Sequence, residues 1–126
     1  WIALSMFSFM VLDGLWLGVV MTGFYRERLA PIARMSGGTL APNWAAALVV
    51  YVLLGIGVAV FAVERSGTAA AAAARAALLG LVVYGVYDFT NYSTLRDWPL
   101  TLALVDTAWG AVASALCAAI VWSVAR

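Results

Sequence analysis

Three aspartates stand inside long apolar runs of this sequence, where their carboxyl groups could do chemistry. Asp13, Asp88 and Asp106 lie within the segments MVLDGLWL, YGVYDFTN and LALVDTAW. An aspartate at the centre of a membrane helix costs roughly 2.5–3.5 kcal/mol on insertion scales, so it is kept where it faces a bundle interior or water. The three carboxyl groups therefore predict either a proton, ion or ligand site inside the membrane, or hydrogen bonds that only fix helix packing.

Tryptophan side chains at helical spacing accompany two of these aspartates. Trp16 follows Asp13 by three residues and Trp109 follows Asp106 by three, so the pattern D-x-x-W occurs twice. Residues three apart share a helix face, so we expect each indole beside its carboxyl group. Each such pair is either an anchored hydrogen bond or one wall of an aromatic cation site. The repeated pattern is either a weak internal repeat or a coincidence.

The third aspartate, Asp88, shares its predicted helix face with Tyr84 and Asn91. Because close carboxylates repel one another, we expect the aspartates to share a proton. The residues predicted to bind an ion or ligand are Asp13, Trp16, Tyr84, Asp88, Asn91, Asp106 and Trp109. The sequence does not indicate whether a metal is bound.

Charged residues just before the fourth apolar run form a second candidate feature. Arg96 and Asp97 directly precede Trp98-Pro99. They form either a surface ion pair or an entrance that selects charge or binds a phosphate headgroup. In the second interpretation, Arg26 and Arg28 join them from the segment after the first apolar run.

The elements that must position these side chains follow from the composition. Of 126 residues, 66% are apolar and 10% are charged, and the mean hydropathy is +1.01. A soluble domain carries roughly a quarter charged residues, so a water-soluble enzyme, a nucleic-acid-binding protein and a disordered chain are excluded. Four apolar runs each approach the ~20 residues that a helix needs to cross the bilayer, and four strands cannot close a barrel. The predicted fold is all-α, an integral membrane up-down-up-down four-helix bundle in a single membrane domain, 1–126, with spans at about 1–24, 44–63, 69–92 and 98–124.

The links between the runs fix the depth of the aspartates. The second and third links are short, and the first carries turn signals at Gly37-Gly38. Short links make neighbouring helices antiparallel. At a rise of ~1.5 Å per residue, the three aspartates then lie roughly 8–16 Å from the membrane side that carries the first and third links. Their comparable depth favours one shared site.

Residue types missing from the chain narrow its chemistry. The sequence has no His and no Lys, and Cys117 is its one cysteine. A Schiff base to retinal or pyridoxal phosphate needs Lys, and the usual haem ligand, zinc ligand and catalytic triad need His. We therefore expect no cofactor. The net charge of +1 gives no basic footprint for nucleic acid.

Small residues suggest partners within the bilayer. Gly14 and Gly18 form a GxxxG motif, which permits close helix approach inside the bundle or between subunits. We expect contact with the lipid bilayer, and either a homo-oligomer or docking onto a larger membrane protein. Four arginines on one side of the membrane against three on the other leave the orientation undetermined. The first apolar run is too long, and lacks the cleavage pattern, for a removed signal peptide.

The motifs together resemble a family of small four-span bacterial membrane proteins catalogued as domain of unknown function 2177. The matching text is DGLWLG followed by FYR, then YGVYDFTNYSTLRDWPL, then VDTAWG. The resemblance covers nearly the whole chain and implies four membrane helices, in the inner membrane of a bacterium, with no assigned reaction. Its signature positions are Asp13, Trp16, Tyr87, Asp88, Thr90, Asn91, Arg96, Asp97, Trp98, Pro99, Asp106, Trp109 and Gly110.

Three functions compete at this point. The first is a protein that binds or translocates protons, a cation or a small polar solute through the aspartate and aromatic cluster. The second is an accessory or structural subunit whose aspartates only join helices. The third, which we rank last because few catalytic groups are present, is a membrane enzyme acting on lipid with an aspartate as general acid or base.

Overall fold

The structure, a computed structural model, describes residues 1–36 and 39–126. Within these residues, four helices are long and apolar enough to cross a membrane, which confirms the predicted all-α membrane fold. The spans consist of α1 (Ile2–Leu15) with η1 (Trp16–Val20), α3 (Trp44–Gly57) with η2 (Val58–Val63), α4 (Ala69–Thr94) and α5 (Leu100–Ala125). The segments η1 and η2 are π-helical turns that end the first and second spans.

The helices begin where the sequence supplies capping groups. The Asn43 side chain accepts a hydrogen bond from the Ala46 backbone N–H at the start of α3, at 3.2 Å. Thr68 does the same for Ala71 at the start of α4, at 3.1 Å. Each side chain satisfies one of the backbone donors that a helix leaves free at its first turn. Pro99, whose ring restrains φ near the helical value, precedes α5.

The first link contains the short helix α2 (Thr22–Leu29) and two strands of two residues each, β1 (Met35–Ser36) and β2 (Thr39–Leu40). The strands pair antiparallel, with Met35 opposite Leu40 and Ser36 opposite Thr39. This small pair lies in the first link and leaves the all-α fold class unchanged. The predicted turn at Gly37-Gly38 lies outside the described residues.

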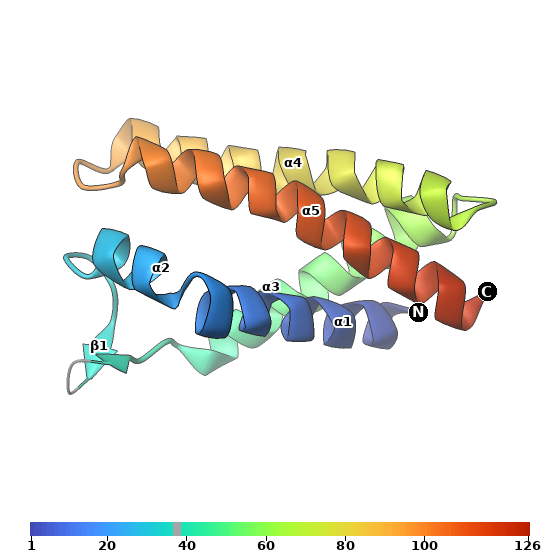
Figure 1. The fold of residues 1–126 in the computed structure, drawn as a ribbon, viewed down its shortest axis with the longest axis horizontal. Helices are drawn as coiled ribbons and strands as arrows, with labels where there is room; N and C mark the ends of the chain where they lie inside the picture. Colours follow the sequence, from blue (N-terminus) through green and yellow to red (C-terminus); the bar gives the residue numbers. More distant parts are fainter. Residues whose placement is uncertain (37–38) are drawn as a thin grey trace.

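The long helices form two pairs. Figure 1 shows α4 beside α5, and α1 beside α3, with successive long helices running in alternating directions. The two pairs meet at the end that holds both chain termini and separate toward the end that holds α2 (Figure 1). The close packing of one end and the separation of the other position the candidate site.

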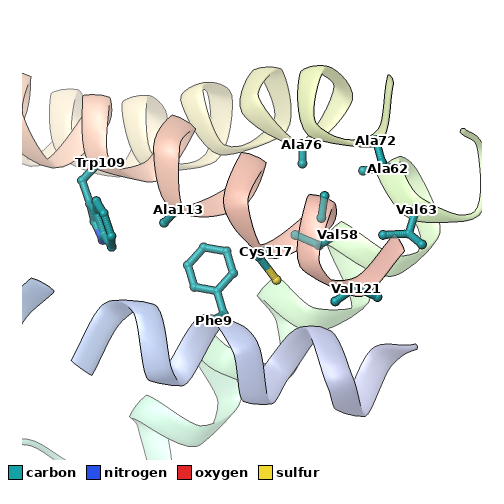
Figure 2. Packing of buried hydrophobic residues seen from close by; sticks show 11 residues of the cluster. Phe9, Val58, Ala62, Val63, Ala72, Ala76, Trp109, Ala113, Cys117 and Val121 are labelled. Atoms are coloured by element: carbon teal, nitrogen blue, oxygen red, sulfur yellow. The ribbon is translucent and has the colours of Figure 1, made fainter. Parts of the chain in front are cut away.

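Small side chains pack the end where the pairs meet. Figure 2 shows Phe9, Ala113 and Cys117 between α1 and α5, and all three are fully buried. Between α4 and α5 the approach is closer still. A Cβ atom on Gly80 would overlap the Gly110 carbonyl oxygen, so this crossing requires glycine. Small residues allow such backbone contact, which gives membrane helices much of their packing energy.

The GxxxG motif does not take part in this packing. A Cβ atom on Gly14 or on Gly18 would meet nothing within 4 Å, and both glycines are exposed. Of the two uses that the sequence left open for the motif, contact inside the bundle is therefore not observed.

Candidate functional site

The two D-x-x-W motifs contact each other across α1 and α5. Trp109 Nε1 donates a hydrogen bond to Asp13 Oδ1 at 2.9 Å, so the indole of one motif binds the carboxylate of the other. The Trp16 and Trp109 rings stack with centroids 4.4 Å apart and planes 4° from parallel. Of the two interpretations of each motif, a hydrogen bond between the indole and the carboxyl group of the same motif is not observed.

The other indole, Trp16, is connected to the aspartate of the other motif, Asp106, through a tyrosine of α2. Trp16 Nε1 donates to the Tyr25 hydroxyl at 3.0 Å, and that hydroxyl donates to Asp106 Oδ1 at 2.8 Å. Burial raises the pKa of the Tyr25 phenol, and the nearby Asp106 carboxylate raises it further. Tyr25 therefore keeps its proton and serves as a donor.

Both carboxylate oxygens of Asp13 accept a hydrogen bond. Besides the Trp109 bond, its Oδ2 accepts a hydrogen bond from the Tyr51 hydroxyl at 2.6 Å. The aspartate is 9% exposed and thereby joins three spans, α1, α3 and α5. A buried carboxylate with two good donors is stabilised without a charged partner. This environment is that of a residue that fixes helix packing.

The π-helical turns lie next to these contacts. In η1 the Met21 N–H binds the Trp16 carbonyl five residues earlier, at 2.7 Å, and in η2 the Glu64 N–H binds Ala59 in the same way at 2.9 Å. A π turn inserts an extra residue and so changes the direction in which the following chain leaves the helix. In η1 the change leads directly into α2, which carries Tyr25 back over the bundle to Asp106.

A cavity of about 670 Å³ occupies the end where the helix pairs separate. Most of its wall is apolar. The apolar residues come chiefly from α3 and α4, and the polar groups come chiefly from α1, α2, α4 and α5. The polar and aromatic lining residues are Asp13, Thr22, Tyr25, Arg26, Tyr84, Tyr87, Trp98, Asp106 and Ser114. The volume falls within the range of roughly 300–1,000 Å³ that ligand pockets occupy.

Asp88 lies outside the cavity wall, buried between α4 and α5. It is 0% exposed, and neither of its carboxylate oxygens has a hydrogen-bond partner among the described residues. The same is true of the Trp98 indole nitrogen and the Thr107 hydroxyl. Asp88 lies within electrostatic reach of Asp106, which does line the cavity. Because a buried polar group without a partner is costly, this arrangement requires an explanation.

The comparison with known families agrees with the sequence motifs. A family described as a predicted membrane protein, DUF2177, matches residues 1–123. The chain belongs to this family. Neither the curated proteins nor the solved structures contain a match to the chain.

Within this DUF2177 chain, the predicted site residues separate into two groups. The structure brings Trp16, Trp109 and Tyr84 together with Asp13 and Asp106, while Asp88 lies near Asp106 but outside the cavity wall. Asn91 lies beside Tyr87 but does not line the cavity wall.

The predicted entrance residues do not lie together around the cavity. Arg26 is exposed and lines the cavity. Arg28 binds the Thr101 hydroxyl at 3.4 Å and pairs with Glu27 at 3.5 Å, which ties α2 to the start of α5. Arg96 and Asp97 are exposed in the third link and do not line the cavity wall.

Two tyrosines of the site were not predicted from the sequence. Tyr25 lies at the end of the first apolar run and was not among the predicted site residues, yet it binds Asp106 inside the bundle. Tyr51 was not considered, although it and Trp44 are the only residues with polar side-chain atoms in the run from 44 to 63. That isolation is the signal that could have identified it, because a hydroxyl deep in an apolar span needs an acceptor.

Proposed function

We propose that this membrane protein binds an organic cation with an apolar body in the cavity between its two helix pairs. The observation that carries the proposal is Asp106, a half-buried carboxylate at the polar end of a mostly apolar cavity. One of its oxygens accepts the Tyr25 hydrogen bond, and no arginine pairs with it within the described residues. The cavity thus offers a negative charge to a ligand.

The charges around the cavity favour a positive ligand. The charged residues of its wall are two aspartates and Arg26, and Arg26 is exposed. Asp13 is engaged with its two donors, so Asp106 is the carboxylate available to the ligand. Tyr25, Tyr84, Tyr87 and Trp98 add aromatic rings to the wall, and aromatic faces attract cations more strongly where water is excluded.

The apolar part of the wall supports access from the bilayer. Val50 and Leu53 of α3, and Val83 of α4, line the cavity and are also exposed, at 52%, 62% and 42%. In a bundle that spans the bilayer, exposed apolar residues of this kind face lipid. A ligand with an apolar body can therefore enter sideways between α3 and α4, and the inner membrane of a bacterium is the proposed location.

The other functions receive less support from the geometry. A bare metal ion prefers several oxygen ligands at once, and within the described residues no three acidic, His or Cys side chains gather as a ligand set. A purely structural role suits Asp13, whose bonds join three helices, but it leaves the cavity and Asp106 without a purpose.

Two ions of nearly the same shape and opposite charge test the proposal. Purified protein in detergent is titrated with tetraphenylphosphonium and, separately, with tetraphenylborate, and heat of binding is recorded. We expect saturable binding of the cation alone. Asp106→Asn should weaken that binding by about tenfold or more, equivalent to ~1.4 kcal/mol. Glu64→Gln, which removes an exposed charge at the opposite end of the bundle, should leave it unchanged.

Two results would contradict the proposal. One is equal binding of both ions, which would assign the affinity to the apolar wall alone. The other is cation binding that Asp106→Asn does not weaken, which would place the ligand elsewhere on the protein.

A further inference from the structure

The proposed cation site leaves one buried carboxyl group unused. Asp88 is fully buried between α4 and α5, and its two oxygens have no hydrogen-bond partner among the described residues. Nothing in the cavity wall accounts for it, because Asp88 does not line the cavity. Its charged neighbour is Asp106, which presents its carboxylate to the cavity from α5. The two carboxyl groups thus connect the ligand site to the interior of the α4–α5 pair.

An ionised Asp88 would be unfavourable in this place. The Trp98 indole N–H lies near Asp88, but no hydrogen bond joins them. An ionised Asp88 would therefore lose its hydration and gain little in return. It would also face the charge of Asp106 across a medium of low dielectric constant, and two such groups do not both ionise readily. A carboxyl group that holds a proton avoids both penalties.

We infer that Asp88 holds a proton that leaves when an organic cation binds at Asp106. The inference rests on the proposed function. The step is balanced in charge and atoms: one carboxyl O–H bond breaks, the proton passes to water, and the cation takes its place. The pair changes from one negative charge to two, and the bound cation adds one positive charge. The total charge of the site therefore stays the same, which a low-dielectric interior favours.

Among the residues that the structure describes, the other groups around the pair are less suited to supply the proton. The titratable or charged groups facing the pair are Tyr84 and Tyr87 on α4, Tyr25 and Arg26 on α2, and Asp13 on α1. The phenol of Tyr25 keeps its proton because burial raises its pKa. Asp13 is held by two donors and Arg26 is exposed. The exchange of a proton for a cation is thus assigned to Asp88 with Asp106.

Proton release provides a direct test. Tetraphenylphosphonium is added to the purified protein in weakly buffered detergent with a pH indicator dye, and protons released per bound cation are counted. We expect up to about one proton per cation, and affinity that rises with pH by at most about tenfold per pH unit. Asp88→Asn should still bind the cation, with no release and an affinity that does not change over the same pH range. Glu64→Gln should behave as the wild type.

The outcomes separate the two proposals. Cation binding by the wild type without proton release, and with the same affinity at every pH, overturns the exchange and leaves the binding function standing. Equal release from Asp88→Asn and the wild type also overturns it, because the proton then comes from another group. Absence of cation binding overturns both proposals. The pH series requires only the wild-type chain, so it decides the question even where Asp88→Asn does not fold.

Discussion

The bond between Asp13 and Tyr51 should contribute measurable stability to the bundle, and a double-mutant cycle isolates that contribution. The hydroxyl lies 2.6 Å from Oδ2, the distance of a strong O–H···O⁻ bond, and the aspartate is 9% exposed. Asp13→Leu removes the acceptor, and Tyr51→Phe removes the donor. Each single change also alters the desolvation of its own side chain, but these separate effects cancel in the cycle.

The geometry sets the size of the expected coupling. Interhelical hydrogen bonds in membrane proteins contribute ~0.6 kcal/mol on average and up to ~1.7 kcal/mol. The short distance and the charged acceptor place this bond toward the upper value, so we expect about 1–1.7 kcal/mol. The pair Asp13 and Trp109, at 2.9 Å, should give a smaller coupling.

The assay is reversible unfolding in mixed micelles of increasing dodecyl sulfate content, followed by far-ultraviolet circular dichroism. The control pair is Asp13→Leu with Tyr92→Phe, because Tyr92 is 45% exposed near the end of α4. Distant sites add within roughly 0.3–0.5 kcal/mol. A coupling of Asp13 with Tyr51 no larger than this control would refute the view that the bond joins α1 to α3.

Two further changes test the packing and the position of α2. Gly80→Ala should destabilise the bundle by about 1–3 kcal/mol, because its Cβ would overlap the Gly110 carbonyl oxygen. Gly14→Ala, with open space around it, should be neutral or stabilise the bundle by up to about 1 kcal/mol. Equal effects of the two changes in the same unfolding assay would contradict the close crossing of α4 and α5. Tyr25→Phe should speed amide hydrogen exchange in α2 more than in α4, because it removes the bond to Asp106, and unchanged exchange would show that other contacts hold α2 in place.

The helices could be predicted because hydropathy alone specifies them. Four apolar runs of membrane-crossing length left no other fold, and the structure contains four such helices in its described residues. The break at Met21 was harder to foresee, because the apolar run continues without a proline or a charge through Phe24. There the chain forms the π turn η1 and then changes direction. Hydropathy does not predict that change of direction.

The contacts of the site could be predicted only in part. Helical spacing correctly placed Trp16 and Asp13 on neighbouring positions of one helix, but spacing within a helix says nothing about which helix lies opposite. The exchange of partners between the two D-x-x-W motifs depends on the crossing of α1 and α5. Tyr25 follows the first apolar run, and its position in the sequence does not indicate that α2 brings it to Asp106.

The three aspartates differ in the number of hydrogen bonds that their carboxyl oxygens accept. This difference reconciles the structural and the ligand-binding interpretations. Asp13 accepts two hydrogen bonds, Asp106 accepts one from Tyr25, and Asp88 accepts none among the described residues. Contacts within and between the two helix pairs fix how the helices stand around the cavity. Asp13 supplies such contacts by joining α1 to α3 and to α5. A satisfied aspartate that fixes the frame is therefore a condition for a cavity in which the less satisfied carboxyl groups meet a ligand.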